Sequence, residues 1–211
     1  MTRGKLIAFE GTDGSGKATQ LKLFTDYLTS GNIAYETMDF PRYGESFFGD
    51  LAGRLLAGEF GKDIAPELAV LPFACDRWLL KDQLHGWLSE GKMVISNRYT
   101  ASSAVYHAAK LPKEKQYPFI DWLYKLEQEV IGLPKEDVAI YFHVPVFMAQ
   151  KLVEGRGKKD MYEEDIEVQK TVEALYLELA LHRSGWKTIE CMEGAVLRTK
   201  EAIHKDVLEI L

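Results

Sequence analysis

The segment GTDGSGK, residues 11–17, has the residue types and the spacing needed to hold a phosphate group. It fits the pattern G-x-x-x-x-G-K, in which backbone N–H groups surround the anion and the next helix points its N-terminus at it. Glycine lets the backbone curl tightly around the anion, and Lys17 adds a mobile positive charge. A glycine turn with a chance lysine is the alternative. An apolar run before the segment and a helical pattern after it favour a nucleotide-phosphate site, formed by Gly11, Thr12, Asp13, Gly14, Ser15, Gly16, Lys17, Ala18 and Thr19.

Position 18 departs from this pattern, because such loops usually carry Ser or Thr after the lysine and this chain carries Ala18. The alanine removes a hydroxyl ligand for Mg²⁺ but leaves the backbone amides and Lys17 in place. Mg²⁺ keeps several of its waters and binds substrate phosphates, so it tolerates the loss of one protein ligand. Thr19 is expected to face an inner phosphate. Ala18 therefore weakens the expected metal site and not the expected phosphate loop.

An arginine follows each of two predicted strands. Arg42 comes just after the run 34–40, and Arg98 comes just after the run 92–96. The carboxyl ends of parallel strands meet at one edge of a sheet, so the two guanidinium groups are expected to converge on a second anion. Either arginine alone could form a surface ion pair. The two together favour an acceptor that carries a phosphate; an acceptor with a free hydroxyl would instead need a carboxylate base.

A possible site for a nucleotide base lies in the segment PFACDRW, residues 72–78. Phe73 and Arg77 are four residues apart and therefore lie on one face of a helix. An aromatic ring with a guanidinium group one turn later suits stacking on a base and hydrogen bonding to its carbonyl. Phe73 considered alone is more typical of a packed core. Next to a phosphate loop, the pair favours a base-binding wall.

Alternating strand and helix patterns must position these residues. Strands are predicted at residues 5–10, 34–40, 92–96, 137–144 and 186–191. Helices are predicted at residues 17–30, 46–58, 66–90, 100–110, 117–131, 146–154, 164–183 and 195–211. This order predicts parallel strand pairing with right-handed crossovers. We expect one α/β domain over residues 1–211, with a doubly wound five-stranded parallel sheet flanked by helices.

Composition narrows the function classes. A chain of 211 residues with 46% apolar and 27% charged residues is typical of one globular domain. The formal charge of −6 argues against nucleic acid as a partner. No apolar run is long enough to cross a membrane or to act as a signal peptide. Cys75 and Cys191 lie far apart without metal-ligand spacing, and we expect both to be buried and reduced, as in a cytoplasmic protein.

The motifs FEGTDGSGK-TQ, DFPR, F-CDRW, VIS-RY--S---Y and GRGKKD-YE together resemble the thymidylate kinase family, from about residue 5 to residue 183. The resemblance implies a P-loop kinase fold with a lid segment. It also implies ATP-dependent phosphorylation of dTMP to dTDP for dTTP synthesis, with Mg²⁺ as cofactor and a homodimer as the assembly. The alternatives are another nucleoside-monophosphate kinase, a deoxynucleoside kinase, or a nucleotide-dependent switch protein.

The resemblance also assigns roles to individual residues. It implies that Arg42 and Arg98 hold the dTMP phosphate, that Phe73 stacks on thymine, and that Arg77 contacts a base carbonyl. Asp13 falls at an acidic position near the sugar and the donor phosphate. The remaining dTMP-binding candidates are Ser102, Tyr106 beside the deoxyribose, and Tyr162, with Ser103 near the same wall.

Residues 154–164 are polar and basic and carry glycines at 155 and 157, which suits a lid that closes over bound nucleotides. A solvated basic loop is the alternative. In the family that the chain resembles, either the phosphate loop or the lid supplies a cation to the transferred phosphoryl group. Residues 12–15 carry no cation. Arg156 is therefore the first candidate, ahead of Lys158 and Lys159, and the catalytic set becomes Lys17, Asp13, Arg98 and Arg156.

Position 97 is a second departure that concerns the metal. The family usually carries aspartate before the arginine, whereas this chain carries Asn97, which offers only a carbonyl oxygen. Asn97 is the candidate metal ligand, with Mg²⁺ held chiefly by phosphates and water. Glu10, Asp13 and Asp39 are further carboxylates near the predicted site. The alternative is a protein that binds nucleotides but phosphorylates poorly.

Overall fold

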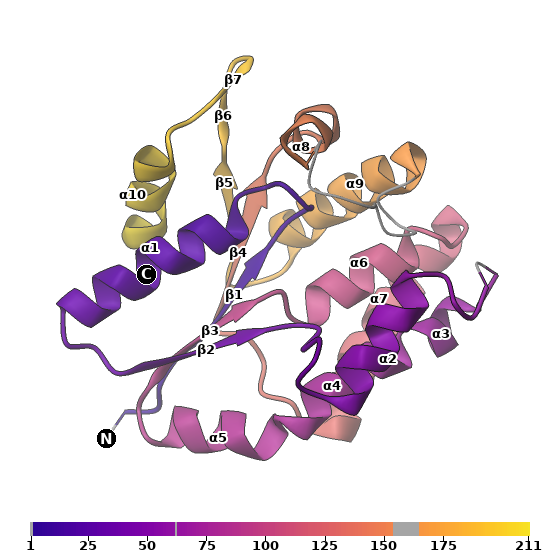
Figure 1. Ribbon diagram of the computed structural model, residues 1–211, viewed down its shortest axis with the longest axis horizontal. Helices are drawn as coiled ribbons and strands as arrows, with labels where there is room; N and C mark the ends of the chain where they lie inside the picture. The colour runs from indigo at the N-terminus through magenta and orange to yellow at the C-terminus, as the bar shows by residue number, and fades with distance from the viewer. Residues whose placement is uncertain (1, 62, 154–164) are drawn as a thin grey trace.

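The computed structural model describes residues 2–61, 63–153 and 165–211. Five parallel strands form one sheet in the order β2-β3-β1-β4-β5 (Figure 1). Their bounds are Leu6–Glu10 for β1, Tyr35–Asp39 for β2, Met93–Asn97 for β3, Val138–His143 for β4 and Trp186–Glu190 for β5. The α/β fold with a doubly wound five-stranded parallel sheet is therefore confirmed.

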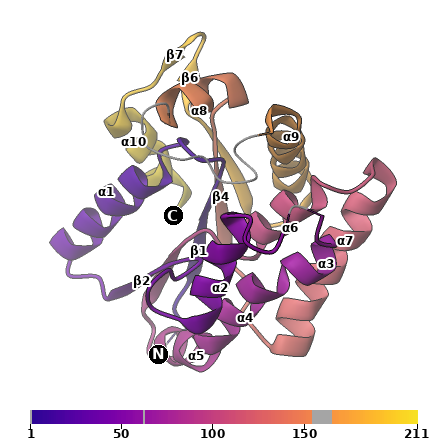
Figure 2. The same cartoon turned by 45° about the vertical axis from the view of Figure 1, so that its right-hand side comes forward.

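Two apolar layers enclose the sheet, because successive side chains of a strand point to opposite faces. Leu6 and Ala8 of β1 pack into one buried cluster, and Ile7 and Phe9 pack into the other. Figure 2 shows α1 and α10 on one side of the sheet and most of the other helices on the opposite side. The layer around Ile7 and Phe9 contains α1 (Lys17–Ser30), α8 (Val146–Val153) and α10 (Lys200–Ile210). The layer around Leu6 and Ala8 contains α5 (Lys81–Ser89), α6 (Thr100–Ala108), α7 (Lys113–Lys125) and α9 (Ile166–His182).

The predicted single helix over residues 66–90 is wrong. The structure has three helices there: α3 (Pro66–Ala69), α4 (Leu71–Leu79) and α5. Pro72 lies in the first turn of α4, and proline is tolerated there because it lacks the N–H that an interior position would have to donate. A small apolar cluster joins α4 to α2 (Phe47–Leu56) through Leu55 and Phe73. This packing fixes α4 against α2.

Two further helix predictions need correction. The helix predicted over residues 117–131 begins at Lys113 as α7, and its last turn is a π-helix, η1, spanning Leu126–Ile131. Gly132 ends it in the left-handed conformation that favours glycine, with φ of 80°. The helix predicted from residue 195 begins only at Lys200 of α10, because a short hairpin, β6 (Met192–Glu193) and β7 (Val196–Leu197), precedes it.

The cysteine prediction holds in part. Both thiols are free, and Cys191 is buried, but Cys75 is partly exposed on α4. Its neighbours Phe73, Ala74, Asp76 and Arg77 occupy the buried face of that helix. No helix in the described part of the chain is both long and apolar enough to span a membrane.

Glu136 gives a testable pH dependence of stability. Its side chain is buried just before β4, and Oε2 has no hydrogen-bond partner among the described residues. Burial raises the pKa of Glu136 from 4.5 to about 7. The folded protein therefore keeps this proton to a higher pH than the unfolded chain does. The stability that the proton provides is complete below the unfolded pKa and is lost as the pH rises through the folded one.

We expect Glu136→Gln to be more stable than the wild type by about 2 kcal/mol at about pH 8, with the difference closing near about pH 5. Urea denaturation of both proteins at the two pH values measures this. Glu129→Gln, a change at an exposed glutamate, should match the wild type at both. A Glu136→Gln protein that is equally destabilised at both pH values would contradict the prediction.

Candidate active site

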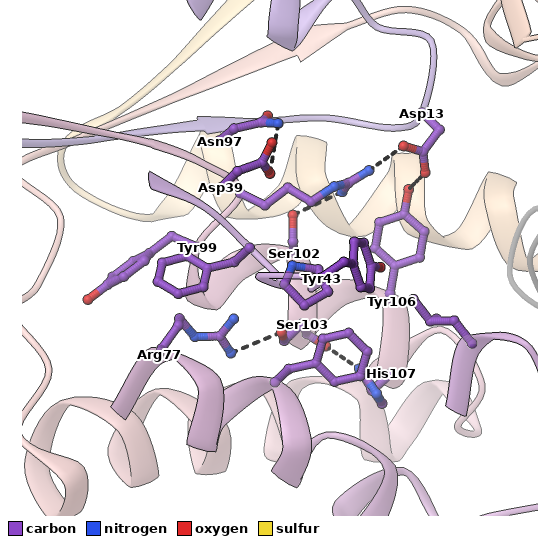
Figure 3. Close-up of a pocket in the computed structure, with 15 residues that line it drawn as sticks. Asp13, Asp39, Tyr43, Arg77, Asn97, Tyr99, Ser102, Ser103, Tyr106 and His107 are labelled. Atoms are coloured by element: carbon purple, nitrogen blue, oxygen red, sulfur yellow. Dashed lines mark hydrogen bonds and ion pairs between the residues drawn. The ribbon is translucent and has the colours of Figure 1, made fainter. Parts of the chain in front are cut away.

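A pocket of about 300 Å³ opens at the carboxyl ends of β2 and β3, between the loop after β1 and helices α4 and α6 (Figure 3). It brings together most of the residues predicted for the acceptor nucleotide. The predicted residues that line it are Asp13, Asp39, Phe73, Arg77, Asn97, Arg98, Ser102, Ser103 and Tyr106. The wall also contains residues that the sequence prediction did not include: Phe40, Pro41, Tyr43, Leu56, Tyr99 and His107.

The loop between β1 and α1 has the geometry of a phosphate cradle. Gly11 and Gly16 have positive φ angles of 149° and 87°, and a Cβ atom on Gly11 would lie 2.9 Å from the carbonyl oxygen of Phe142. Only glycine fits the loop at Gly11. Lys17 opens α1, and its Nζ donates to the carbonyl oxygens of Gly11 at 2.9 Å and Thr12 at 2.8 Å.

Burial, together with the charge of Arg98, lowers the pKa of Lys17 to about 7. The acceptors of its ammonium group are neutral oxygens of the loop, namely the two carbonyls and the hydroxyl of Ser15. A phosphate group arriving in the loop would offer charged oxygens instead, and charge-assisted hydrogen bonds are the stronger kind. The loop therefore keeps Lys17 folded back at a position from which it can turn to an incoming anion.

Arg98 links the phosphate loop to the pocket. Its Nη2 donates to Asp13 Oδ1 at 2.7 Å, and its Nη1 donates to the carbonyl oxygen of Gly11 at 3.2 Å and to Ser102 Oγ at 3.1 Å. The guanidinium carbon lies 5.3 Å from the ring centre of Tyr106. Burial opposes ionisation of Asp13, but the charge of Arg98 outweighs it and lowers the pKa of Asp13 to about 2. The two form a permanent ion pair at the mouth of the loop.

The backbone of Arg98 is strained, with φ of 66°. A left-handed conformation at a residue other than glycine costs about 1–3 kcal/mol and persists only where neighbours enforce it. Here the Arg98 N–H donates to the carbonyl oxygen of Phe9 at 2.9 Å, and the Ser96 hydroxyl donates to the Arg98 carbonyl at 2.5 Å. These contacts turn the chain at the end of β3 so that the guanidinium group points toward the phosphate loop.

The buried carboxylate of Glu10 supports Arg98 indirectly, through Ser102, a role that the sequence did not single out. Glu10, at the end of β1, is fully buried and accepts from the Tyr99 N–H at 2.8 Å, from Ser102 Oγ at 2.6 Å and from the Tyr176 hydroxyl at 2.9 Å. These three partners come from the start of α6 and from α9. Glu10 is therefore committed to internal hydrogen bonds, whereas Asp39 is exposed at the same edge of the sheet.

Arg42, unlike Arg98, does not line this pocket. Its guanidinium group pairs with the buried Asp76, at 3.0 Å from Nε and 2.9 Å from Nη2, and it lines a neighbouring groove that includes Leu80 and Trp87. The pocket itself is lined by the residues on either side of Arg42, Pro41 and Tyr43. The structure therefore does not bring the two predicted acceptor arginines together, and a role for Arg42 toward an acceptor phosphate stays a prediction.

The predicted base-binding wall lies across the pocket from the phosphate loop. The ring of Phe73 meets His107 edge-on at 5.2 Å between ring centres. Burial lowers the pKa of His107 to about 4, so this ring is neutral at physiological pH. Arg77 lies deeper and donates to Ser103 Oγ at 2.9 Å (Figure 3). Aromatic surface and a directed guanidinium group thus share one wall, as a planar ligand with polar edges requires.

Asn97 pairs with Asp39 across β3 and β2, where Nδ2 donates to Oδ1 at 3.0 Å. Its own Oδ1 is buried and has no hydrogen-bond partner among the described residues. Within the described ranges, no three His, Cys, Asp or Glu side chains are grouped so as to hold a metal ion. Arg156, Lys158, Lys159 and Tyr162, and with them the predicted lid, lie outside the described residues.

A phosphate loop facing a second polar pocket across the carboxyl edge of a parallel sheet is the arrangement of a P-loop phosphotransferase with a nucleoside-monophosphate acceptor. The family model of thymidylate kinase matches residues 9–203. The chain belongs to the thymidylate kinase family, as its motifs predicted, and the nucleoside-monophosphate kinase class is confirmed with it.

Relatives cover most of this chain. The thymidylate kinase of Mycobacterium tuberculosis is 34% identical over 189 residues, which span 86% of this chain and 87% of that protein. The thymidylate kinase of Plasmodium falciparum is 31% identical over 207 residues, or 98% and 89% of the two chains. Among solved structures, thymidylate kinase from Candida albicans superposes with a TM-score of 0.79 at 24% identity, over 99% of this chain and 91% of that one, and this likeness supports the fold.

Proposed function

We propose that this protein transfers the γ-phosphoryl group of ATP to the 5′-phosphate of dTMP, giving dTDP and ADP. An oxygen of the dTMP phosphate attacks the γ-phosphorus, and the bond from that phosphorus to the bridging oxygen of the β-phosphate breaks. The observation that carries the proposal is the placement of Arg98, whose Nη1 contacts the phosphate loop at Gly11 and whose Nη2 contacts Asp13 at the rim of the pocket. The product is a substrate for a further kinase step toward dTTP.

The residues divide between the two substrates. Lys17 and the loop amides hold the donor phosphates. Arg98 holds the acceptor phosphate, and Asp13 keeps its guanidinium group in place. Phosphoryl transfer depends on such positioning and on charge compensation more than on covalent chemistry. In the acceptor pocket, the other proposed contacts are Phe73 and Arg77 to the base, Tyr106 and Ser102 beside the sugar, Arg42 toward the phosphate, and Tyr162. Arg156 of the predicted lid is the proposed cation for the transferred phosphoryl group.

The residues present fit a Mg²⁺ ion held largely by nucleotide phosphates and water. Asn97 has an unused buried oxygen, and Asp39 beside it is exposed at the same edge. These two side chains would supply what the protein contributes to the ion. When bound, the ion neutralises charge on the transferred phosphates.

Restoring a hydroxyl at position 18 tests this view of the metal. Ala18 is exposed at the start of α1, so serine fits there without a clash. We expect Ala18→Ser to lower the free Mg²⁺ concentration for half-maximal rate by about 3- to 10-fold, because a direct oxygen ligand is added. Magnesium titrations of the rate measure it. Ala18→Cys, with a similar size but a soft ligand atom, is the matched control, and an equal shift in both variants would contradict the explanation.

We also propose a homodimer in a reducing, cytoplasmic compartment. Helices α2 and α4 leave Phe47, Trp78 and Leu79 exposed at 73%, 48% and 46%. Large exposed apolar groups on adjacent elements are typical of interfaces. Sedimentation equilibrium of the wild type and of Trp78→Glu would decide the assembly, and a monomeric wild type would contradict the dimer.

The two unpaired cysteines support the proposed reducing compartment.

The function is tested by an enzyme-linked ADP-release assay at saturating Mg²⁺. The acceptors, offered separately, are dTMP, dUMP, dCMP, dGMP and thymidine. Selective turnover with dTMP supports the proposal. Turnover with thymidine would overturn the role of Arg98 as a phosphate-holding residue, and preference for another monophosphate would change the substrate. An absence of turnover with every acceptor would mean that Ala18 and Asn97 have cost the protein its metal site.

A further inference from the structure

We propose that Glu127 is the positioning residue through which the pocket selects a pyrimidine with a 4-carbonyl over one with a 4-amino group. This inference rests on the proposed function and deepens it, because it names the side chain that holds Arg77 in place for the base. Glu127 lies 50 residues beyond Arg77 in the sequence and does not itself line the pocket.

The contact between the two side chains is bidentate. Arg77 Nε donates to Glu127 Oε2 at 2.8 Å, and Arg77 Nη2 donates to Glu127 Oε1 at 2.5 Å. The Thr100 hydroxyl also donates to Oε2 at 2.6 Å. The Arg77 side chain is 1% exposed and that of Glu127 is fully buried. A fork of two parallel charge-assisted bonds in a buried place fixes both the position and the plane of the guanidinium group.

The π-helical turn places Glu127 for this contact. Glu127 is the second residue of η1 and is its buried member, whereas Glu129 and Val130 of the same turn are exposed. The Glu127 carbonyl oxygen accepts from the Leu133 N–H at 2.8 Å, which ties the end of the turn to its start. Single π-turns are uncommon in helices and occur frequently at functional sites. Here the turn directs one carboxylate inward beneath α4.

The pairing decides what Arg77 can still offer to a ligand. Arginine has five N–H donors and no acceptor. Glu127 engages Nε and Nη2, and Nη2 also donates to Ser103 Oγ. No hydrogen bond joins Nη1 to any residue that the structure describes, and Arg77 lines the pocket. Nη1 is therefore the nitrogen that can reach a bound base.

A donor held rigidly in this way distinguishes carbonyl from amine. It can bond to the 4-carbonyl of thymine or uracil, whereas the 4-amino group of cytosine is itself a donor and would leave both groups unpaired. The carboxylate of Glu127 also cancels the charge of Arg77, so this end of the pocket does not compete with Arg98 for the phosphate. A mobile or uncompensated guanidinium group would lose both properties.

The test is binding, which does not depend on turnover. Isothermal titration calorimetry of wild type and Glu127→Gln would use three ligands: dTMP, dCMP, and the corresponding deoxynucleotide of 2-pyrimidinone, which has no substituent at position 4. We expect the variant to bind dTMP about 10-fold more weakly and to lose about 10-fold in the preference for dTMP over dCMP. Its affinity for the 2-pyrimidinone nucleotide and for ATP should match the wild type.

Two further variants keep the test decisive. Glu129→Gln, at an exposed position of the same turn, should behave as the wild type. Thr100→Val removes one hydrogen bond to Glu127 without changing charge. It should reduce the preference for dTMP over dCMP by about 2- to 3-fold. This variant replaces Glu127→Gln in the test if Glu127→Gln does not fold.

An equal loss of affinity for all three nucleotides would overturn the proposal, because it would indicate general damage to the pocket. So would an unchanged preference in both Glu127→Gln and Thr100→Val, or a wild type that binds dCMP as well as dTMP. The ADP-release assay judges the proposed function separately: a wild type that prefers dTMP in binding but transfers no phosphoryl group would refute the function and leave the role of Glu127 standing.

Discussion

Replacing Arg98 by alanine should lower kcat/KM for dTMP by about 10³-fold or more, judged from single charge-stabilising residues in related chemistry. The guanidinium group contacts Gly11 of the phosphate loop, Asp13 and Ser102 at once. Its loss removes the cation proposed for the acceptor phosphate and leaves Asp13 as an unpaired negative charge beside that phosphate. The measurement is steady-state kinetics with dTMP varied at saturating ATP.

The Arg98 prediction has an internal check. The charge of Arg98 is what holds the pKa of Asp13 near 2, so in Arg98→Ala this pKa should rise. Protonating Asp13 would relieve repulsion of the acceptor phosphate, and the residual activity should therefore increase as the pH falls. Adding Asp13→Asn to Arg98→Ala should recover part of the rate and flatten that pH profile. Arg54→Ala, which breaks an exposed ion pair with Glu59, is the matched control and should leave kcat/KM unchanged.

Replacing Arg156 by alanine should lower kcat by about 10³-fold while the KM values for ATP and dTMP change little, as expected for a cation that acts on the transferred group. Residues 12–15 of the phosphate loop contain no cation. The two arginines that line the pocket, Arg77 and Arg98, are each paired with a carboxylate. Because Lys17 is assigned to the donor phosphates, the predicted lid segment is the proposed source of a further cation for the moving phosphoryl group.

Single-turnover kinetics separates this effect from binding or product release. Lys158→Ala and Lys159→Ala are the matched controls within the same segment and should reduce kcat far less than Arg156→Ala. Near-normal turnover in Arg156→Ala would exclude the assignment and move the role to Lys158 or Lys159. A rise in KM for ATP without a fall in kcat would instead indicate a residue that binds the donor nucleotide.

The features that could be predicted from the sequence are those in which neighbours along the chain suffice. The phosphate loop is one, because Gly11, Gly16 and Lys17 lie within seven residues of one another and Lys17 bonds to Gly11. The positive φ angles of the loop fall at its glycines, as residue type requires. The strands are another, since apolar runs such as residues 6–9 must be buried on both faces of a parallel sheet. Their order along the chain then determined which loops share the carboxyl edge.

Local patterns were insufficient for the helix over residues 66–90. Its apolar spacing continues through the breaks at Val70 and Leu80, so periodicity alone indicates one helix. Pro72 was the available signal for the first break, because proline favours the first turn of a helix over its interior. Similarly, helical periodicity gives no warning that the end of α7 becomes a π-turn.

By itself, then, the sequence determined the α/β class, the phosphate loop, the family and most of the residues that line the pocket. Only the tertiary structure decided which partner each charged side chain has. Arg42 pairs with Asp76, Arg77 with Glu127 and Glu10 with Tyr176, across 34, 50 and 166 residues. Such pairings depend on how helices pack over the sheet, and a buried charge takes whichever partner the packing places within reach, because leaving it unpaired is costly.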